Sequence, residues 1–535
     1  MADPTNEFLG ALLQNEDFVG KLSARLGLNK ADTINSATGL LWYDLKPIVQ
    51  MLYPFKELIP CIGKLPRVAA DGGNAFHWKR VVAINAGNVS PGVSEGNRGA
   101  RIPIVVQDQQ ATYKTMGLES SATFEARLGS LNLTPDAIGV QVQSTLRSTM
   151  IAEEQTLFLG NASLQLGTTP TPTCSAGGTG GNLPSSGTLY VVCVALSGLG
   201  WLNYTPYNSI TNTGGVPGQV TKVNADGSTD TFGGGSAAPS AEGTAALSSG
   251  VVVTASVAAV PGAYAYAWYI STGTGTETLA IITQANEVIF SKLPSAGQQP
   301  VNNLKVGGAF VDNSTNNLLP DGILTQIFGS VFGSAPGTAM STNPNLPNGI
   351  SLTTGGSLVY YAATGNTGLT IAGTNIGEFD ALLQAAYDQY KIGFDKIYMS
   401  ATDLANFSGT MLSQGSSSMF RILFDAEAET GRIVAGRRVT SYLNKFFGNT
   451  MDIEVHPYLP PGTIVFWSDR TPYELSGVGN ILEAHVRQDY YQIQWPLVTR
   501  RYEYGVYVDE VFACYFTPAF AVITNLNAPT GVPKF

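Results

Sequence analysis

The stretch from Thr134 to Gly160 constrains this chain most, because it carries the signals of one long, uninterrupted helix. Thr134 can cap the first turn, Pro135 suits the first helical position, and Asp136 places negative charge at the positive end of the helix dipole. Gly160 can turn left-handed after the last turn. Five apolar residues fall close to one stripe at helical spacing, namely Ile138, Val142, Leu146, Met150 and Leu157. The pattern predicts a helix of roughly 35–40 Å, which taken alone is typical of an ordinary core helix.

A long β-hairpin is predicted before this helix. Residues 75–85 and 102–115 are strand-like, and the loop between them, residues 86–101, is polar and rich in glycine. A two-stranded arm is marginal by itself in water and needs a partner surface. We therefore expect this arm to contact something other than its own domain.

Directly after the helix the composition changes. No charged residue occurs from Gln155 to Thr221, and residues 163–317 are rich in Gly, Thr, Ser, Ala and Val. Short strand-like runs at 188–196, 251–260, 263–271, 278–283 and 287–290 predict an inserted β-sandwich. Its aromatic run, residues 264–270, is similar to an immunoglobulin-like or fibronectin-type strand with an inward aromatic face.

The uncharged residues 251–270 imitate a membrane span. Pro261 and Gly262 interrupt them, so two strands joined by a turn are the better interpretation. The acidic start of the chain lacks the basic region of a signal peptide. The sequence therefore predicts neither a membrane segment nor secretion.

Outside the insert, helices and strands alternate. We predict helices at 6–28, 378–390 and 402–407, and strands at 357–362, 396–400, 439–443, 451–456, 463–467 and over much of 481–525. The fold class is therefore α+β.

Charged residues make up 13% of the chain, about half the usual share. This composition suits surfaces that meet other protein. The net charge of −10 argues against a protein that coats nucleic acid, although it permits a container for it.

No pattern of residues indicates catalysis, a metal or a cofactor. His77, His456 and His485 lie far apart, and the phosphate-loop, nucleophile-elbow and dinucleotide-binding motifs are absent. The four cysteines (Cys61, Cys174, Cys193 and Cys514) are scattered, so free thiols are the default, with a Cys174–Cys193 pair as the minor alternative. Adjacent Glu153 and Glu154 indicate solvated or salt-bridged residues on a helix face.

Charged residues on the hairpin and late in the chain are candidates for contacts between copies. The alternative is scattered surface charge of little energetic weight. The candidates are Lys79, Arg80, Glu95, Arg98, Arg101, Lys114, Arg437 and Arg438.

The order of these parts resembles the HK97-fold major capsid proteins of tailed bacteriophages. The resemblance depends on the arm, the hairpin, a long helix ending in AEEQTLFLGN, the step Pro320-Asp321-Gly322-Ile323, a helix–strand–helix unit and VHPYLPPGTIVFW. It implies an N-terminal arm (1–71), an E-loop hairpin (72–123), a P-domain spine helix (124–162), the P-domain return (318–376), an A-domain (377–463) and C-terminal strands (464–535). The inserted domain, 163–317, departs from the basic fold.

The resemblance implies a non-enzymatic subunit that forms pentamers and hexamers of an icosahedral shell around double-stranded DNA, without sequence-specific binding. Scaffolding, portal and cement proteins are the implied partners, and the virion, assembled in the host cytoplasm, is the implied location. The insert would lie outside, for stabilisation or decoration, with weak glycan binding as the alternative. An encapsulin-like compartment shares the fold but usually lacks so large an insertion, and a surface or fibre adhesin is disfavoured by the absence of a secretion signal.

Overall fold

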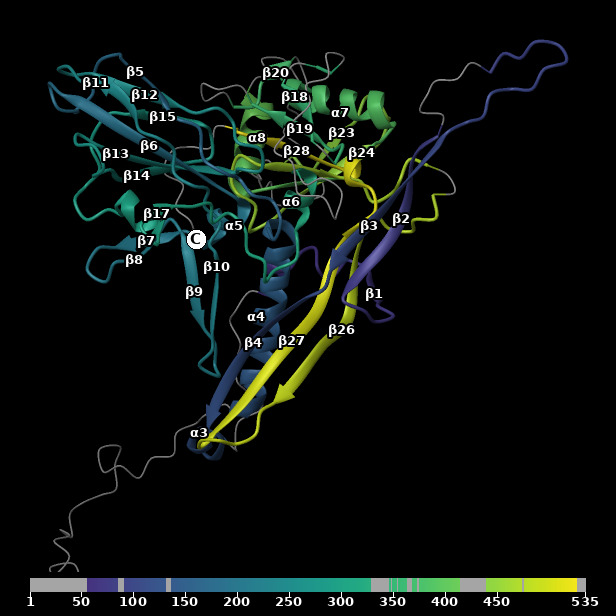
Figure 1. Cartoon of the computed structure of the whole chain (residues 1–535), viewed down its shortest axis with the longest axis horizontal. Helices are drawn as coiled ribbons and strands as arrows, with labels where there is room; N and C mark the ends of the chain where they lie inside the picture. Colours follow the sequence, from purple (N-terminus) through teal and green to yellow (C-terminus); the bar gives the residue numbers. More distant parts are fainter. Residues whose placement is uncertain are drawn as a thin grey trace, which may run out of the picture.

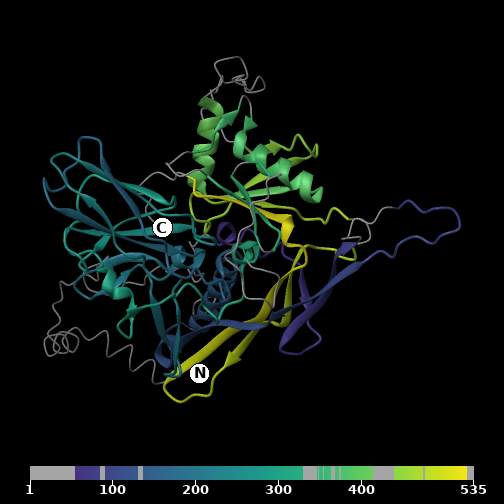
Figure 2. The same cartoon turned by 45° about the horizontal axis from the view of Figure 1, so that its top comes forward.

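The computed structural model describes residues 55–84, 91–130, 136–328, 346–347, 349–353, 355–362, 368–372, 375–413, 439–473 and 476–526. These residues form the predicted mixture of helices and strands, in three parts. A long sheet lies beside the long helix, a second sheet carries two helices, and a block of strands is inserted between them (Figure 1, Figure 2). The predicted helix at 6–28 lies outside the described residues.

The predicted long helix is α4, Ala137–Leu159. Its capping residue is Asp136, whose carboxylate accepts a hydrogen bond from the Gly139 amide at 2.9 Å, whereas Thr134 lies outside the described residues. The prediction of a left-handed Gly160 is wrong, because its φ is −56°. Glycine is needed there for space, since a Cβ would lie 2.4 Å from the carbonyl oxygen of Pro320.

The predicted apolar stripe of α4 is buried only at its end. Leu157 is buried, but Ile138, Val142, Leu146 and Met150 are half-buried. The buried positions include polar residues, namely Thr145, Thr149, Glu153, Glu154 and Thr156. The three threonine hydroxyls donate to carbonyl oxygens one turn earlier in α4, so they need no partner from outside the helix.

A four-stranded sheet runs beside α4 in the order β1-β26-β27-β4 (Figure 1). Its strands are β1 (Arg67–Ala69), β4 (Lys114–Thr123), β26 (Leu482–Gln494) and β27 (Arg501–Cys514). The pairing of β1 with β26 is parallel, and the others are antiparallel. The short helices η1 (Lys56–Leu58) and α3 (Phe124–Gly129) precede β1 and follow β4.

The predicted hairpin is present as β2 (Ala75–Ile84) and β3 (Ile104–Thr112). Its register runs from Ala75 opposite Thr112 to Ile84 opposite Ile104, with one irregularity after Val81. The two strands lie beside the long sheet, and the loop at residues 91–103 extends away from the rest of the molecule (Figure 1). β4 follows directly but pairs with β27, so the hairpin ends before residue 114.

The second sheet has seven strands in the order β18-β19-β28-β25-β22-β24-β23. Its bounds are β18 (Ile350–Leu352), β19 (Leu358–Tyr361), β22 (Lys396–Met399), β23 (Ser441–Leu443), β24 (Thr450–Val455), β25 (Ile464–Trp467) and β28 (Phe520–Thr524). The small pair β20 (Ile371–Ala372) and β21 (Asn375–Ile376) and the turn η3 (Thr517–Ala519) lie close in sequence.

Both faces of this sheet are buried in hydrophobic cores. One face packs with the end of α4 and with α6 (Ile323–Phe328), and Phe158, Val465 and Trp467 belong to that core. The other face packs under α7 (Gly377–Tyr390) and α8 (Ala401–Ser413), around Phe379 and Phe466. The predicted helices and strands of this region are therefore confirmed.

The inserted block is a β-sandwich of two antiparallel sheets, ordered β11-β6-β13-β14 and β15-β12-β5. Its strands are β5 (Thr173–Gly177), β6 (Thr188–Leu196), β11 (Gly243–Ala246), β12 (Val252–Ser256), β13 (Ala265–Ser271), β14 (Thr278–Thr283) and β15 (Glu287–Phe290). The membrane-like stretch is thus two strands, β12 and β13, in opposite sheets. The likeness to an immunoglobulin-like domain stays a prediction.

A second layer covers the outer face of the sheet that contains β6 and β13. The residues that pack on this face come from α5 (Gly198–Asn203), η2 (Val301–Leu304) and the segment at Val216. The other short strands of the insert are β7 (Thr205–Asn208), β8 (Thr213–Gly215), β9 (Gln219–Val223), β10 (Thr229–Gly233), β16 (Lys305–Val306) and β17 (Ala309–Phe310). Tyr266 and Trp268 face the sandwich core, and Tyr269 faces this second layer with Trp201 and Leu304. β13 is therefore buried on both faces, not only on the inward face that the sequence predicted.

The insert is fastened to the rest of the chain at two places. At the neck, Asp321 accepts hydrogen bonds from the amides of Ala162 and Ser163, and Tyr264 of the insert donates its hydroxyl to the Leu324 carbonyl at 3.0 Å. Farther away, Asn286 and Asn525 exchange two hydrogen bonds. The insert is therefore docked as a rigid part and not tethered by a linker.

Among the described residues, no helix is long and apolar enough to cross a bilayer. All four cysteines are free thiols, so Cys174 and Cys193 do not pair.

Candidate functional site

The hairpin has one face that packs and one that does not. At its base, Phe76 stacks on His485 with ring centroids 3.7 Å apart, and Trp78 meets the ring of Tyr515. Farther out, Val81, Ile104 and Val106 are 59%, 63% and 56% exposed. These three β-branched side chains form an apolar surface on a two-stranded ribbon, which the described residues leave exposed.

Most predicted contact residues lie on this hairpin. Lys79, Glu95, Arg98 and Arg101 are exposed, and Arg80 is half-buried, which lowers its pKa through desolvation. Lys114 differs, because it begins β4 and is half-buried in the long sheet. Arg437 and Arg438 lie outside the described residues. The structure therefore brings five of the eight candidates together on the hairpin and its loop.

A second apolar surface, which the sequence analysis did not predict, lies at the opposite end of the long sheet. It comprises α3 and the turn between β26 and β27 (Figure 1). Its exposed large apolar residues are Phe124, Leu128, Trp495, Leu497 and Val498. Val498 is 89% exposed, so the described residues leave this end of the sheet uncovered.

Glu154 is the centre of a buried polar clamp that holds the segment before β1. Its carboxylate accepts hydrogen bonds from the amides of Cys61 at 3.0 Å and Ile62 at 2.6 Å. His456 lies 2.9 Å away through Nε2, and the side chains of Glu154 and His456 are fully buried. The interpretation of Glu154 as a solvated face residue was therefore wrong, because donors from distant parts of the chain satisfy it.

His456 acts in this clamp as a neutral donor. Its Nδ1 accepts the Tyr458 amide at 3.4 Å, which leaves the hydrogen on Nε2 to be donated to Glu154. Burial lowers the pKa of His456, and the hydrogen bond and charge of Glu154 oppose this effect.

Cys61, Glu154 and His456 each offer one possible metal ligand, and these atoms lie within 4.8 Å of one another. The Tyr458 contact places the imidazole hydrogen of His456 on Nε2. A metal ion could bind Nε2 only after this hydrogen had left. Burial also raises the pKa of the Cys61 thiol, which disfavours the thiolate that binds metal. We therefore interpret this group as a hydrogen-bonded clamp.

Glu153 points to a different cluster, around Arg67. The guanidinium contacts Glu153 at 2.6 Å, Asp489 at 2.9 Å and Glu510 at 3.2 Å. Tyr490 also donates its hydroxyl to Glu153. Glu153 is therefore salt-bridged, which was one of the two predicted alternatives. Its side chain is also fully buried.

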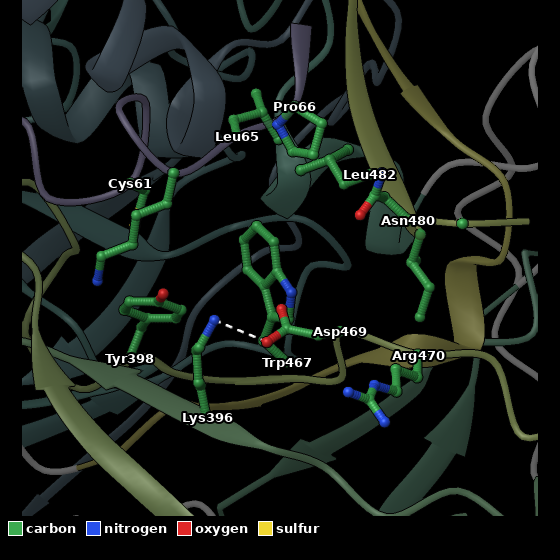
Figure 3. Close-up of a pocket in the computed structure, with 13 residues that line it drawn as sticks. Cys61, Leu65, Pro66, Lys396, Tyr398, Trp467, Asp469, Arg470, Asn480 and Leu482 are labelled. Atoms are coloured by element: carbon green, nitrogen blue, oxygen red, sulfur yellow. Dashed lines mark ion pairs between the residues drawn. The ribbon is translucent and has the colours of Figure 1, made fainter.

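A cavity of about 400 Å³ lies between the segment before β1, the seven-stranded sheet and the start of β26 (Figure 3). Its cations are largely neutralised, because Lys396 pairs with Asp469 at 2.7 Å and Lys64 pairs with Glu454 at 3.0 Å. Cys61 is its thiol, and the raised pKa of that thiol argues against a nucleophile. Arg470 also lines the cavity, and its acid and base, Asp469 and Lys396, are paired with each other, so the cavity gives no support for catalysis.

No family model matches the sequence, and no curated protein matches it. The chain is similar to solved structures. These include the capsid of a native GTA particle (8% identity, 92% of this chain and 100% of that chain, TM-score 0.42) and the capsid of cyanophage A-1(L) (9% identity, 92% and 100%, TM-score 0.42). Another is a holo-SrpI encapsulin complex from Synechococcus elongatus (8% identity, 94% and 100%, TM-score 0.37). Identities and TM-scores this low support no conclusion about function. The functional argument depends instead on the surfaces described above.

Proposed function

We propose that this chain is the major capsid protein of a tailed bacteriophage, which assembles through pentamers and hexamers into an icosahedral shell around double-stranded DNA. The observation that carries the proposal is the hairpin, which extends from the body with its apolar outer half uncovered. An arm of this kind has no use in a monomer, whereas a neighbouring copy would cover it.

The energetics of this contact favour assembly by many modest interfaces. Fully burying a large aliphatic side chain contributes about 1.5–3 kcal/mol. Val81, Ile104 and Val106 are each more than half exposed, so covering them gives roughly 3–5 kcal/mol per hairpin. One such contact is weak, but it recurs for each copy in a closed shell.

The exposed charges of the hairpin would fix the register of this contact. Lys79, Glu95, Arg98 and Arg101 are solvent-exposed on the hairpin and its loop, and Lys79 lies two residues from Val81. Charges at the rim of an interface select the partner and its orientation more than they add affinity. Arg80, Lys114, Arg437 and Arg438 belong to the same proposal as contacts between copies.

The acidic balance of the chain suits the enclosed cargo. A net charge of −10 disfavours tight binding of the shell wall to DNA, which must be packed and released. Scaffolding, portal and cement proteins would be further partners, and the subunit would be assembled in the host cytoplasm.

The inserted sandwich would lie on the outer surface and stabilise the subunit. Its support is the docking at two places, where Tyr264 enters the core of the body and Asn286 pairs with Asn525.

Assembly of the purified full-length chain tests the proposal. We expect closed shells, or rings of five and six, by electron microscopy and light scattering. The double variant Val81→Lys with Val106→Asp should stay monomeric with an unchanged thermal midpoint, since both side chains are exposed in the subunit and their opposite charges face each other across the two strands. The control Val223→Asp, at a residue 70% exposed on the insert, should assemble normally.

Two results would contradict this proposal. One is assembly of the double variant as efficiently as the wild type. The other is a wild-type chain that remains monomeric even with the scaffolding protein of its own phage. Shells that form in cells and enclose protein instead of DNA would favour an encapsulin-like compartment.

A further inference from the structure

The Arg67 cluster contains more acid than base. Glu153 and Glu510 have fully buried side chains, Asp489 is partly exposed, and Arg67 is the cation that contacts all three. If every carboxyl group were ionised, the cluster would hold an uncompensated negative charge away from water. Buried charge of this kind is strongly unfavourable unless a proton neutralises it.

The hydrogen bonds show which carboxyl group holds the proton. Glu153 uses one oxygen to accept from Arg67 and the other to accept from Tyr490, so both act as acceptors. Glu510 accepts from Arg67 through Oε2. Its Oε1 is buried and has no hydrogen-bond partner among the described residues. Glu510 Oε1 is therefore the atom with room for a proton, which would face Glu153.

The neighbouring elements supply few compensating charges. Facing Glu510 are Arg67 from β1, Glu153 from α4, and Asp489 and Tyr490 from β26. From β4, Lys114 is the register partner of Glu510 and shares its face of the sheet, but it is half-buried and its charge acts on Asp321. Burial raises the pKa of Glu510, the Glu153 charge raises it further, and Arg67 opposes both.

We propose that the proton on Glu510 is a latch that fixes β1 to the long helix and sheet, and that loss of this proton releases β1. β1 has three residues and a single neighbour, β26, so it has little else to hold it. With Glu510 ionised, two adjacent buried carboxylates would repel each other across one guanidinium. Because desolvation and this repulsion outweigh the attraction of Arg67, the cluster would then favour the entry of water, and β1 would become free to move away while the Glu154 clamp holds the segment before it.

The sign of the pH dependence follows from the raised pKa. The latch contributes fully to stability below the ordinary glutamate pKa of 4.5 and is lost as pH rises through the folded-state pKa of Glu510. Between pH 4.5 and that folded-state pKa the opening constant of β1 rises about tenfold per pH unit, and above it the opening constant no longer changes with pH.

The clamp at Glu154 provides an internal control. It holds the amides of Cys61 and Ile62 in the same segment without Arg67 or Glu510. By contrast, the Ala70 amide donates to Val486 at 2.8 Å and depends on the docking of β1. The latch should therefore affect Ala70 and leave Cys61 and Ile62 unchanged.

Hydrogen exchange of the full-length chain from about pH 5 to about pH 9, corrected for intrinsic rates, tests whether the proton on Glu510 holds β1 in place. We expect exchange of the peptide containing Ala70 to accelerate at least tenfold with rising pH, whereas the peptide containing Cys61 and Ile62 keeps its protection. In Glu510→Gln, a neutral stand-in for the protonated acid, Ala70 should be protected at every pH. Glu125→Gln, which removes only an exposed partner of Arg500, should behave as the wild type.

The proposal is overturned if protection of Ala70 in the wild type does not depend on pH, or if Cys61 and Ile62 lose protection in parallel with it. It is also overturned if Glu510→Gln retains the wild-type pH dependence. The comparison of the two wild-type peptides needs no variant, and none of these results depends on shell formation.

Discussion

Replacing Glu154 with glutamine should free the segment before β1 from the long helix. The carboxylate faces three donors, the amides of Cys61 and Ile62 and the Nε2 hydrogen of His456. A glutamine side chain offers one oxygen in their place, and its amide group is itself a donor. At least one of the three donors would therefore face another donor in a fully buried site.

The magnitude follows from these contacts. A hydrogen bond to a charged group contributes about 1.5–3 kcal/mol, and a buried donor left unpaired costs about 1–3 kcal/mol. Removing a buried charge recovers part of this loss. We expect a net destabilisation of about 3 kcal/mol, which corresponds to roughly 150-fold faster opening.

Hydrogen exchange of the peptide that spans residues 59–66 measures this opening directly. The matched control is Glu57→Gln, the same substitution at an exposed position five residues before Ile62; it should leave exchange unchanged. If Glu154→Gln changes exchange by less than about fivefold, or no more than the control does, the clamp does not hold the segment and the reasoning is wrong.

Two further predictions concern His456 and the insert. Because burial lowers the pKa of His456, the subunit should lose stability as pH falls below about 6.5. The thermal midpoint of His456→Gln should depend less on acid pH than that of the wild type. Equal acid dependence in both proteins would contradict the neutral-donor role. Replacing residues 164–318 by a short linker removes Leu164 and Tyr264 from the body core, so the thermal midpoint should drop by the equivalent of about 3–5 kcal/mol. An unchanged midpoint would show that the insert does not stabilise the subunit.

The strand predictions succeeded where short-range patterns decide the backbone. The strands β6, β14 and β15 have the bounds predicted from apolar runs and turn residues. The hairpin and the helix α7 followed from the same local signals. Alternation and helical spacing depend on neighbours within a few residues, so a sequence carries them explicitly.

The predictions about α4 show where such signals end. Its existence and length followed from the sequence, but the reason for Gly160 did not. A left-handed turn is the common role of glycine after a helix, whereas here the Pro320 carbonyl comes too close for a side chain. That neighbour lies in the segment that returns from the insert, and no local pattern indicates it.

The same limit applies to the acidic pair of α4. Adjacent carboxylates on a helix predict a solvated or salt-bridged face, yet Glu153 and Glu154 are both fully buried. The Cys61 amide that binds Glu154 lies 93 residues away and His456 lies 302 residues away, while Glu153 binds Arg67. The sequence alone determined the long helix, the projecting arm and the main strands of the sandwich and the second sheet, but not the short helices α3, α5 and α6. Only the tertiary structure decided which charges are buried, because the donors that make burial favourable come from segments that meet only in the folded chain.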